Sequence, residues 1–203
     1  MELAFSQACE NNKPAILSVL KQAFSTTKNV LEIGSGTGQH AIHFAEHLPQ
    51  LVWQTSDLPI NHYSINQRVI NSGLNNILEP MTLDLTEDWS FINDDNTRYF
   101  DGIFTANTLH IVSWPLVQRF FTGVGNNLAK EGTLCIYGPF NYDGEFTSAS
   151  NQQFDLWLKE RDQHSGIRDF EAIVTLANAA GLSLITDHTM PANNRLLAFR
   201  KTS

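Results

Sequence analysis

The chain has 203 residues, of which 42% are hydrophobic and 10% aromatic, and its formal net charge is -8 at pH 7. This length and apolar content predict one compact domain over residues 1–203 rather than a disordered chain. The acidic charge, without any cluster of Lys and Arg, argues against nucleic acid as a partner.

The ends and the cysteines of the chain predict a cytosolic protein. No apolar run approaches the length of a membrane-spanning helix, and the first residues lack the pattern of a secretory signal, so no membrane partner is expected. Cys9 and Cys135 are far apart in sequence, and Cys135 falls in an apolar run, so both thiols are expected to be reduced. The oligomeric state is left open.

Strands and helices are predicted to alternate along the chain, as in a parallel α/β sheet. The first helix is predicted to open at Asn12-Lys13-Pro14, with proline near its first position. The predicted strands cover residues 30–33, 51–56, 77–83, 100–105 and 133–137, and then 182–186 and 195–200. The further helices are predicted at 39–48, 61–71, from 113–115 onward, 151–162 and 170–180. The pattern predicts an α/β fold with a seven-stranded, mostly parallel sheet, helices on both faces and a C-terminal antiparallel hairpin.

Residues 30–38 read Val-Leu-Glu-Ile-Gly-Ser-Gly-Thr-Gly and join the first predicted strand to the next helix. They place Glu32 near a strand end, followed by three alternating glycines. Glycines in such a turn allow positive φ and let a ligand lie against the backbone, beside the N–H groups of a helix N-terminus. The turn is therefore predicted to bind a cofactor, and the alternative is a glycine turn with a structural role only.

The spacing of the glycines identifies the expected cofactor. A dinucleotide-binding turn has its third glycine one place later, where this chain has Gln39, which counts against NAD. Glu32, partly desolvated, needs a cationic or hydrogen-bonding partner, and the ammonium of S-adenosylmethionine supplies one. The run resembles motif I of the class I methyltransferases, an acidic residue, any residue, then G-x-G-x-G. The resemblance implies that S-adenosylmethionine, or its product S-adenosylhomocysteine, lies on the turn. The predicted contacts there are Glu32, Gly34, Ser35, Gly36 and Gly38.

Three further segments at predicted strand ends are candidates for cofactor contacts. Asp57, followed by Leu58, comes nineteen residues after Gly38 and is predicted to accept both ribose hydroxyls; the alternative is a turn or helix-capping aspartate. Asp84 and Leu85 are predicted to hold the adenine, with a capping role for Asp84 as the alternative. Asn107 is predicted to contact the methionine end.

The acceptor pocket is predicted from segments that follow strands four and five. His110 is the candidate base or substrate ligand, although an isolated histidine is more often structural. Tyr137 and Asn141 are predicted to line the pocket, with Trp114 and Phe140 as apolar walls. Arg168 is predicted to bind an anion, and the alternative is an ion pair with Asp169. The loop at 138–150 is predicted to act as a lid.

His40, His43 and His47 share one face of the helix predicted at 39–48, which invites a zinc interpretation. No Cys, Asp or Glu supplies an obvious further ligand nearby, so a solvated helix face is expected and no metal is predicted.

Over nearly its whole length the chain resembles the small class I methyltransferase-like proteins called domain of unknown function family 938, which includes the animal methyltransferase-like protein 26. The resemblance rests on Asn12-Lys13 and on the runs at 35–40, 43–45, 137–140, 150–151, 154–155, 166–169 and 190–194. It implies the Rossmann-like class I methyltransferase fold and S-adenosylmethionine, but no acceptor. It adds Asn12, Lys13 and Asn193 as candidate substrate contacts, with a hairpin turn as the alternative for Asn193. Asn11 stands where the family usually has Arg.

Together these patterns predict an S-adenosylmethionine-dependent methyltransferase that acts on a small molecule. Within the single domain, residues 1–27 are expected to form an N-terminal helix and lid segment, and residues 139–170 a substrate-side insertion. The second hypothesis is a protein that binds the cofactor without turnover, or one whose partner is a protein. An NAD oxidoreductase is third, and Gln39 is the feature against it.

Overall fold

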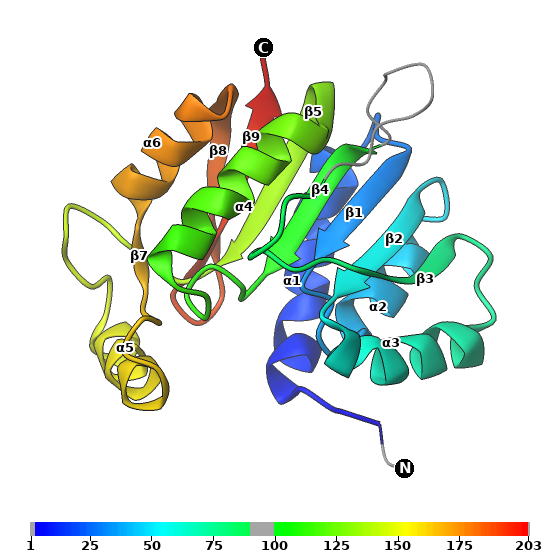
Figure 1. Ribbon diagram of the computed structural model, residues 1–203, viewed down its shortest axis with the longest axis horizontal. Coiled ribbons are helices and arrows are strands. Elements are labelled where there is room, and N and C mark those ends of the chain that lie inside the picture. Colours follow the sequence, from blue (N-terminus) through cyan, green and yellow to red (C-terminus); the bar gives the residue numbers. More distant parts are fainter. Residues whose placement is uncertain (1–2, 90–99, 203) are drawn as a thin grey trace.

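The computed structural model describes residues 3–89 and 100–202 and shows one large sheet between two layers of helices (Figure 1). The sheet has seven strands in the order β3-β2-β1-β4-β5-β9-β8. The strands are β1 (Asn29–Ile33), β2 (Val52–Asp57), β3 (Ile77–Thr82), β4 (Phe100–Ala106), β5 (Leu128–Gly138), β8 (Leu182–Met190) and β9 (Asn194–Lys201). Neighbouring strands from β3 to β5 are parallel, and β9 is antiparallel to both β5 and β8. The predicted fold class is confirmed.

The strand order reverses beside β1. The chain runs outward from β1 to β2 and β3 and then returns to place β4 on the other side of β1. In open sheets of this type, ligands bind at the carboxyl ends of the strands where the order reverses. The topology therefore places the binding region at the ends of β1 and β4.

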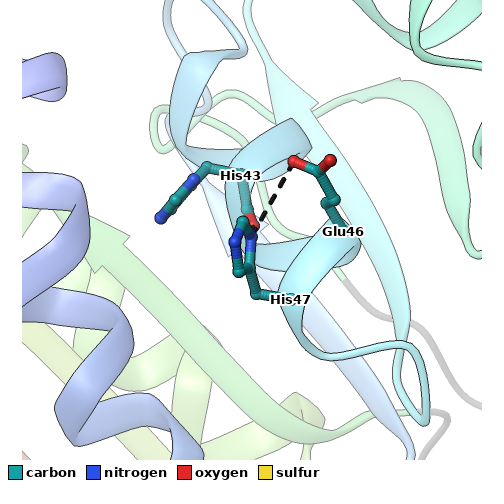
Figure 2. Close-up of side chains that lie close together, drawn as sticks. All are labelled: His43, Glu46 and His47. Atoms are coloured by element: carbon teal, nitrogen blue, oxygen red, sulfur yellow. Dashed lines mark hydrogen bonds and ion pairs between the residues drawn. The ribbon is translucent and has the colours of Figure 1, made fainter.

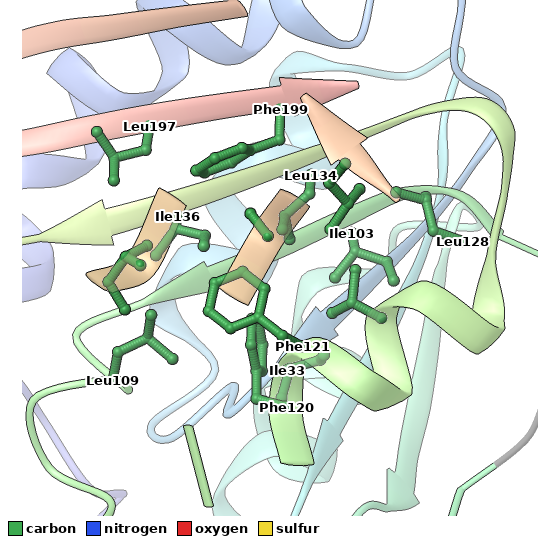
Figure 3. Packing of buried hydrophobic residues seen from close by; sticks show 14 of the residues in the cluster. Ile33, Ile103, Leu109, Phe120, Phe121, Leu128, Leu134, Ile136, Leu197 and Phe199 are labelled. Carbon is green, nitrogen blue, oxygen red and sulfur yellow. The ribbon is translucent and has the colours of Figure 1, made fainter. Parts of the chain in front are cut away.

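The helices cover both faces of the sheet. They are α1 (Gln7–Ala23), α2 (Gln39–His47), α3 (Pro59–Ser72), α4 (Trp114–Asn127), α5 (Ala149–Arg161) and α6 (Phe170–Ala179). Apolar residues of α1 and α2 pack with Trp53 and Phe104 in one core cluster. On the other face α4 and α6 close a second cluster, in which Phe120 and Phe121 meet residues of β1, β4, β5 and β9 (Figure 3).

The first helix begins earlier than the sequence predicts. α1 begins at Gln7, where the Ser6 side chain caps it by accepting a hydrogen bond from the backbone N–H of Cys9, and Pro14 lies inside the helix. The predicted start at residues 12–14 is wrong because the proline ring removes only one N–H. Burial of Ile16 and Leu20, which follow the proline, stabilises the helix against that loss.

The predicted end of α3 is confirmed. Gly73 follows its last residue with φ +65°, a left-handed conformation that glycine adopts without a steric penalty from a Cβ atom.

β5 is longer than the predicted strand because it takes up polar residues at its start. Its pairing with β4 shifts register between Phe100 and Gly102, and Glu131 has a φ of +62°. Such an irregularity lets a polar segment without alternating apolar residues join a strand. The apolar run in the sequence therefore predicts only the later part of β5.

Two short strands tie the loop after β5 to the start of α6. Residues Phe140–Asn141 (β6) pair in parallel with Arg168–Asp169 (β7), and Tyr142 forms a bridge with Glu145. These pairings anchor the first half of the segment 138–150. In Figure 1, α5 follows this segment and stands apart from the two layers, on the side of the sheet where β4 and β5 end.

Candidate functional site

The glycine turn between β1 and α2 is held by the end of β2. The backbone N–H groups of Gly34 and Ser35 both donate to the carbonyl oxygen of Ser56, at 3.1 and 2.9 Å. Gly36 has a φ of +56°, and a Cβ built on it would meet no heavy atom within 4 Å. The backbone at Gly36 is therefore open on the side where a side chain would point, which leaves room for a ligand.

Glu32 is buried beneath this turn. Its Oε2 accepts hydrogen bonds from Trp53 Nε1 at 3.1 Å and Ser35 Oγ at 3.0 Å. Burial raises the pKa of the Glu32 carboxyl to about 7, although these two hydrogen bonds act in the opposite direction. A buried acid with such a pKa favours a cationic neighbour, because a positive charge would offset the cost of ionising it.

Asp57 ends β2 and faces the same turn. Its Oδ2 accepts from the Gly36 N–H at 2.6 Å, and its Oδ1 accepts from the Leu58 N–H at 2.7 Å and Asn61 Nδ2 at 2.8 Å. Both the ribose prediction and the capping alternative fit, since an ionised carboxylate offers about four acceptor sites. Leu58 is 43% exposed beside it, so its apolar side chain remains accessible to a ligand.

Asp84 and Leu85 follow β3. Asp84 is exposed at its carboxyl group and accepts from the Thr86 N–H at 2.8 Å; this hydrogen bond lowers the pKa of Asp84. The capping contact named as the alternative is thus present, and adenine binding stays a prediction. Leu85 is buried in the core with the residues that α4 covers.

The ends of β4 and β5 meet in front of the turn. Asn107 has a φ of +58°, and its N–H donates to the carbonyl oxygen of Tyr137 at 2.9 Å. The neighbouring Thr108 contacts the glycine turn, because a Cβ on Gly34 would lie 2.9 Å from Thr108 Oγ1. The glycine turn and the ends of β4 and β5 therefore form parts of one wall.

Beside this wall lies a cavity of about 940 Å³. It brings together four of the predicted residues: Asn12, Asn107, His110 and Tyr137. The others that line it come from the N-terminal segment and α1, the loop after β4, the residue between β5 and β6, α5 with its following residues, and the β8–β9 turn with the start of β9. They are Ser6, Ala8, Asn11, Ile111, Pro139, Ser150, Asn151, Phe154, Trp157, Leu158, Arg161, Asp162, Ser165, Pro191, Ala192 and Asn194.

His110 is buried at one side of the cavity. Its ring meets Phe154 edge to face, with 5.4 Å between ring centroids. Burial, and the nearby positive charge of Arg168, lower the pKa of His110 to about 4. The imidazole is therefore neutral at pH 7, and the same burial and positive charge make it a weak base.

Tyr137 and Asn12 connect the cavity to α2. Burial raises the pKa of the Tyr137 hydroxyl, against the effect of a hydrogen bond with Asn12. Asn12 Oδ1 also lies 2.6 Å from His40 Nε2. His40 is 5% exposed, so the expectation of a solvated histidine face is wrong at this position: β4 and α1 cover it.

The rest of that face brings three possible metal ligands together (Figure 2). One ligand atom from each of His43, Glu46 and His47 lies within 4.8 Å of the others. The predicted absence of a nearby acid is therefore wrong, because Glu46 lies one helical turn from His43. The cluster lies on a partly solvent-facing turn of α2, and none of its residues lines the large cavity.

Five other candidate residues do not line the cavity. Lys13 pairs with Glu10 and borders a separate polar depression. Phe140 and Asn141 form β6, and Trp114 packs against the core cluster that includes Phe140, so all three lie outside the lining. Asn193 lies at the tip of the β8–β9 hairpin with a φ of +57°, as the hairpin-turn alternative requires, and its carbonyl accepts from Asn151 Nδ2 at 3.1 Å.

Arg168 is used by the protein itself. It donates to the carbonyl oxygens of Leu109, Val112 and His164, at 3.0, 2.5 and 2.9 Å. Its guanidinium also lies 5.9 Å from the centroid of the Trp114 ring. These contacts give Arg168 a structural role in holding the loop after β4. It does not line the cavity, and among the described residues it forms no ion pair with Asp169, so anion binding by Arg168 stays a prediction.

We therefore expect Arg168→Gln to act on stability. Loss of charge-assisted bonds to buried carbonyls should lower the free energy of unfolding by about 3 kcal/mol, measured by urea denaturation. Lys130→Gln, which removes an exposed charge at the far end of β5, is the matched control and should change it little. A stable Arg168→Gln protein that loses only ligand binding would support the anion-binding interpretation.

The sequence predicts α5 within the substrate-side insertion at 139–170, but none of its residues is predicted as a contact. Phe154, Trp157 and Arg161 lie at positions i, i+3 and i+7, which share one helix face, and all three line the cavity. That spacing in the sequence indicates a shared helix face. Three side chains are too few, however, to distinguish a cavity wall from an ordinary buried face.

The sheet order, the terminal hairpin and the glycine turn define the Rossmann-like fold of the class I methyltransferases. A family model described as "Protein of unknown function (DUF938)" matches residues 3–201, and the chain belongs to that family.

Solved structures support the fold at low sequence identity. An O-methyltransferase family protein from Burkholderia thailandensis is 18% identical with a TM-score of 0.78, over 94% of this chain and 56% of that one. An O-methyltransferase family 2 protein from Planctomyces limnophilus, in complex with apigenin, is 16% identical with a TM-score of 0.81, over 96% and 58%. An O-methyltransferase from neocarzinostatin biosynthesis, with S-adenosylmethionine and a naphthoic acid bound, is 14% identical with a TM-score of 0.75, over 95% and 54%. The chain thus spans just over half the length of these structures.

Within residues 3–89 and 100–202, no helix combines the length and apolar character needed to cross a membrane.

Proposed function

We propose that the protein transfers the methyl group of S-adenosylmethionine to a small-molecule acceptor. The observation that carries this proposal is the wall shared by the glycine turn and the cavity. Thr108 contacts Gly34 of the turn, and the adjacent Asn107 lines the cavity. A ligand that extends along the turn would therefore present its end to the cavity.

The residues of the turn fit this cofactor. Glu32 would face the ammonium of the methionine part, the open backbone at Gly36 would contact the cofactor, and Asp57 would accept from the ribose hydroxyls. Asp84, Leu58 and Leu85 are the remaining candidates around the adenine. The cofactor would supply a methyl group on a positively charged sulfur.

The cavity residues would then bind and orient the acceptor. Transfer to an acceptor oxygen would form an oxygen–carbon bond and break the carbon–sulfur bond, and the electron pair would stay on sulfur. His110 is neutral at pH 7 and is the candidate to receive the proton that a hydroxyl acceptor loses. Asn107 and Tyr137 would hold the acceptor oxygen near the end of the turn.

The size of the cavity favours a small molecule over a protein. Its volume of about 940 Å³ is at the upper end of what ligand pockets of roughly 300–1,000 Å³ provide. The complexes of two solved relatives with apigenin and a naphthoic acid agree with such an acceptor. A cytosolic location is part of the proposal and is supported by the two free thiols, Cys9 and Cys135. The likeness to the animal methyltransferase-like protein 26 rests on the sequence motifs.

Calorimetry with S-adenosylhomocysteine tests the cofactor assignment. Asp57→Ala should weaken binding roughly tenfold or more, because charge-assisted hydrogen bonds contribute about 1.5 to 3 kcal/mol each. Asp101→Ala is the matched control, since Asp101 also accepts from backbone N–H groups, those of Lys28 and Asn29, but at the opposite end of the sheet.

Three results would count against the proposal. Binding of NADH without S-adenosylhomocysteine would overturn the cofactor, and unchanged affinity in a folded Asp57→Ala protein would reduce Asp57 to a capping residue. Cofactor binding without turnover on any small molecule would favour the second hypothesis, a binding protein or a protein-directed enzyme.

A further inference from the structure

The wall of the cavity formed by α5 carries two stacked aromatic rings and a cation. The rings of Phe154 and Trp157 lie 5.7 Å apart with an interplanar angle of 18°. The guanidinium of Arg161 lies 4.6 Å from the centroid of the Trp157 ring. All three side chains come from one helix face and line the cavity, so they form a continuous aromatic and cationic surface there.

This surface is accessible although it is apolar. Trp157 is 46% exposed, so a ligand can reach its ring. The same lining includes the apolar residues Ile111, Pro139 and Pro191, together with several Asn and Ser residues. Flat rings favour a planar, apolar ligand, because stacking on an aromatic face adds to the gain from burying area.

Arg161 supplies positive charge at one end of this surface. Among the described residues it forms no ion pair, and the one acid that lines the cavity, Asp162, accepts from the backbone N–H of His164 at 2.9 Å. The other titratable base in the lining, His110, is neutral at pH 7. Arg161 is therefore the group able to grip an anion, which a planar guanidinium does through two hydrogen bonds.

Hydrogen bonds of Asn151 and Asp155, two buried residues of α5, fix the position of this face. Asp155 is 2% exposed, and it accepts from the Ile167 N–H at 2.8 Å and from Lys159 Nζ at 2.6 Å. Asn151 donates to the Asn193 carbonyl in the β8–β9 turn. The aromatic face is thus anchored to two other segments and can serve as a preformed wall.

We propose that the acceptor is a planar aromatic molecule that carries a carboxylate or a similar anionic group. Its rings would pack against the exposed parts of Phe154 and Trp157, and its anion would pair with Arg161. Residues 154 and 161 are separated by about 10 Å along a helix, so the acceptor would be longer than one ring. A hydroxyl at its other end would reach Asn107 and His110 and take the methyl group. The inference rests on the proposed methyltransferase function.

Three synthetic probes separate the two features of the proposed acceptor. Biphenyl-4-carboxylate has both the flat rings and the charge, its amide lacks the charge, and 4-cyclohexylcyclohexanecarboxylate lacks the flat rings. Each is titrated by calorimetry into protein saturated with S-adenosylhomocysteine. Biphenyl-4-carboxylate should bind at least about tenfold more tightly than either of the others.

Substitutions in α5 test which residues bind the charge and the rings of the probes. Arg161→Gln should weaken binding of biphenyl-4-carboxylate about tenfold and leave its amide unchanged, and Arg161→Lys should fall between. Trp157→Leu should weaken both aromatic probes and leave the saturated acid unchanged. Leu156→Ala, which alters an exposed residue of the same helix outside the cavity, is the control and should change none of them.

The outcomes distinguish this inference from the proposed function. Failure of S-adenosylhomocysteine to bind overturns the function. Normal cofactor binding with equal affinity for all three probes, or with no effect of Arg161→Gln on the carboxylate, overturns the acceptor class alone. Circular dichroism of each variant shows that α5 remains folded, and Arg161→Lys keeps the charge test valid if Arg161→Gln is unstable.

Discussion

Replacing Gly36 with alanine is expected to lower the affinity for S-adenosylhomocysteine by roughly a hundredfold, because a methyl group would enter the space proposed for the cofactor. Gly36 has a φ of +56°, and apart from its two chain neighbours no described residue has a heavy atom within 4 Å of the position that the new Cβ would take. The free protein therefore accommodates the methyl group without a clash. Its only cost there is the left-handed conformation, about 1 to 2 kcal/mol of stability.

Gly73→Ala is the matched control for this experiment. Gly73 has a similar φ of +65°, and a Cβ there would also meet nothing within 4 Å, but it ends α3 away from the turn. Both variants should show a similar loss of stability in urea denaturation, and only Gly36→Ala should lose affinity in calorimetry. Equal affinities for the two variants would place the cofactor elsewhere.

Glu32→Gln is expected to remove a loss of roughly 3 kcal/mol in the free energy of unfolding that the natural protein undergoes as pH rises. Burial raises the pKa of Glu32 from 4.5 to about 7 in the folded protein. Between these two values the folded protein keeps a proton that the unfolded chain releases, so this group makes the protein less stable as pH rises. Above about pH 7 both states are ionised, and the loss is complete and constant. Glutamine cannot ionise and avoids the loss.

The measurement is the difference in unfolding free energy between Glu32→Gln and the natural protein. This difference should grow in favour of the variant from about pH 4 to about pH 8. Burial lowers the pKa values of His40 and His110, which makes the folded protein more stable as pH rises, and this contribution cancels because both proteins share it. An ammonium beside Glu32 would hold the carboxylate ionised, so cofactor binding near pH 7 should release a proton from the natural protein and not from the variant. A difference independent of pH would show that Glu32 is ionised throughout.

Local pattern was enough to predict most elements. The apolar run before Gly34 and the stripe after Gly38 give β1 and α2 close to their predicted bounds, since both depend on residues within a few positions of one another. The same reasoning misplaced the start of α1, because the cap at Ser6 and the packing around Pro14 outweigh a proline signal read alone.

The sequence by itself determined the turn that the proposed cofactor would occupy, because glycine spacing and a neighbouring acid act over a few consecutive residues. Only the tertiary structure decided which groups face the cavity. It directs Arg168 to backbone carbonyls, buries His40 against Asn12, and brings Arg161 to a wall shared with Asn107. Burial and the partners of a side chain set its charge and reach, and both come from segments far apart in the chain.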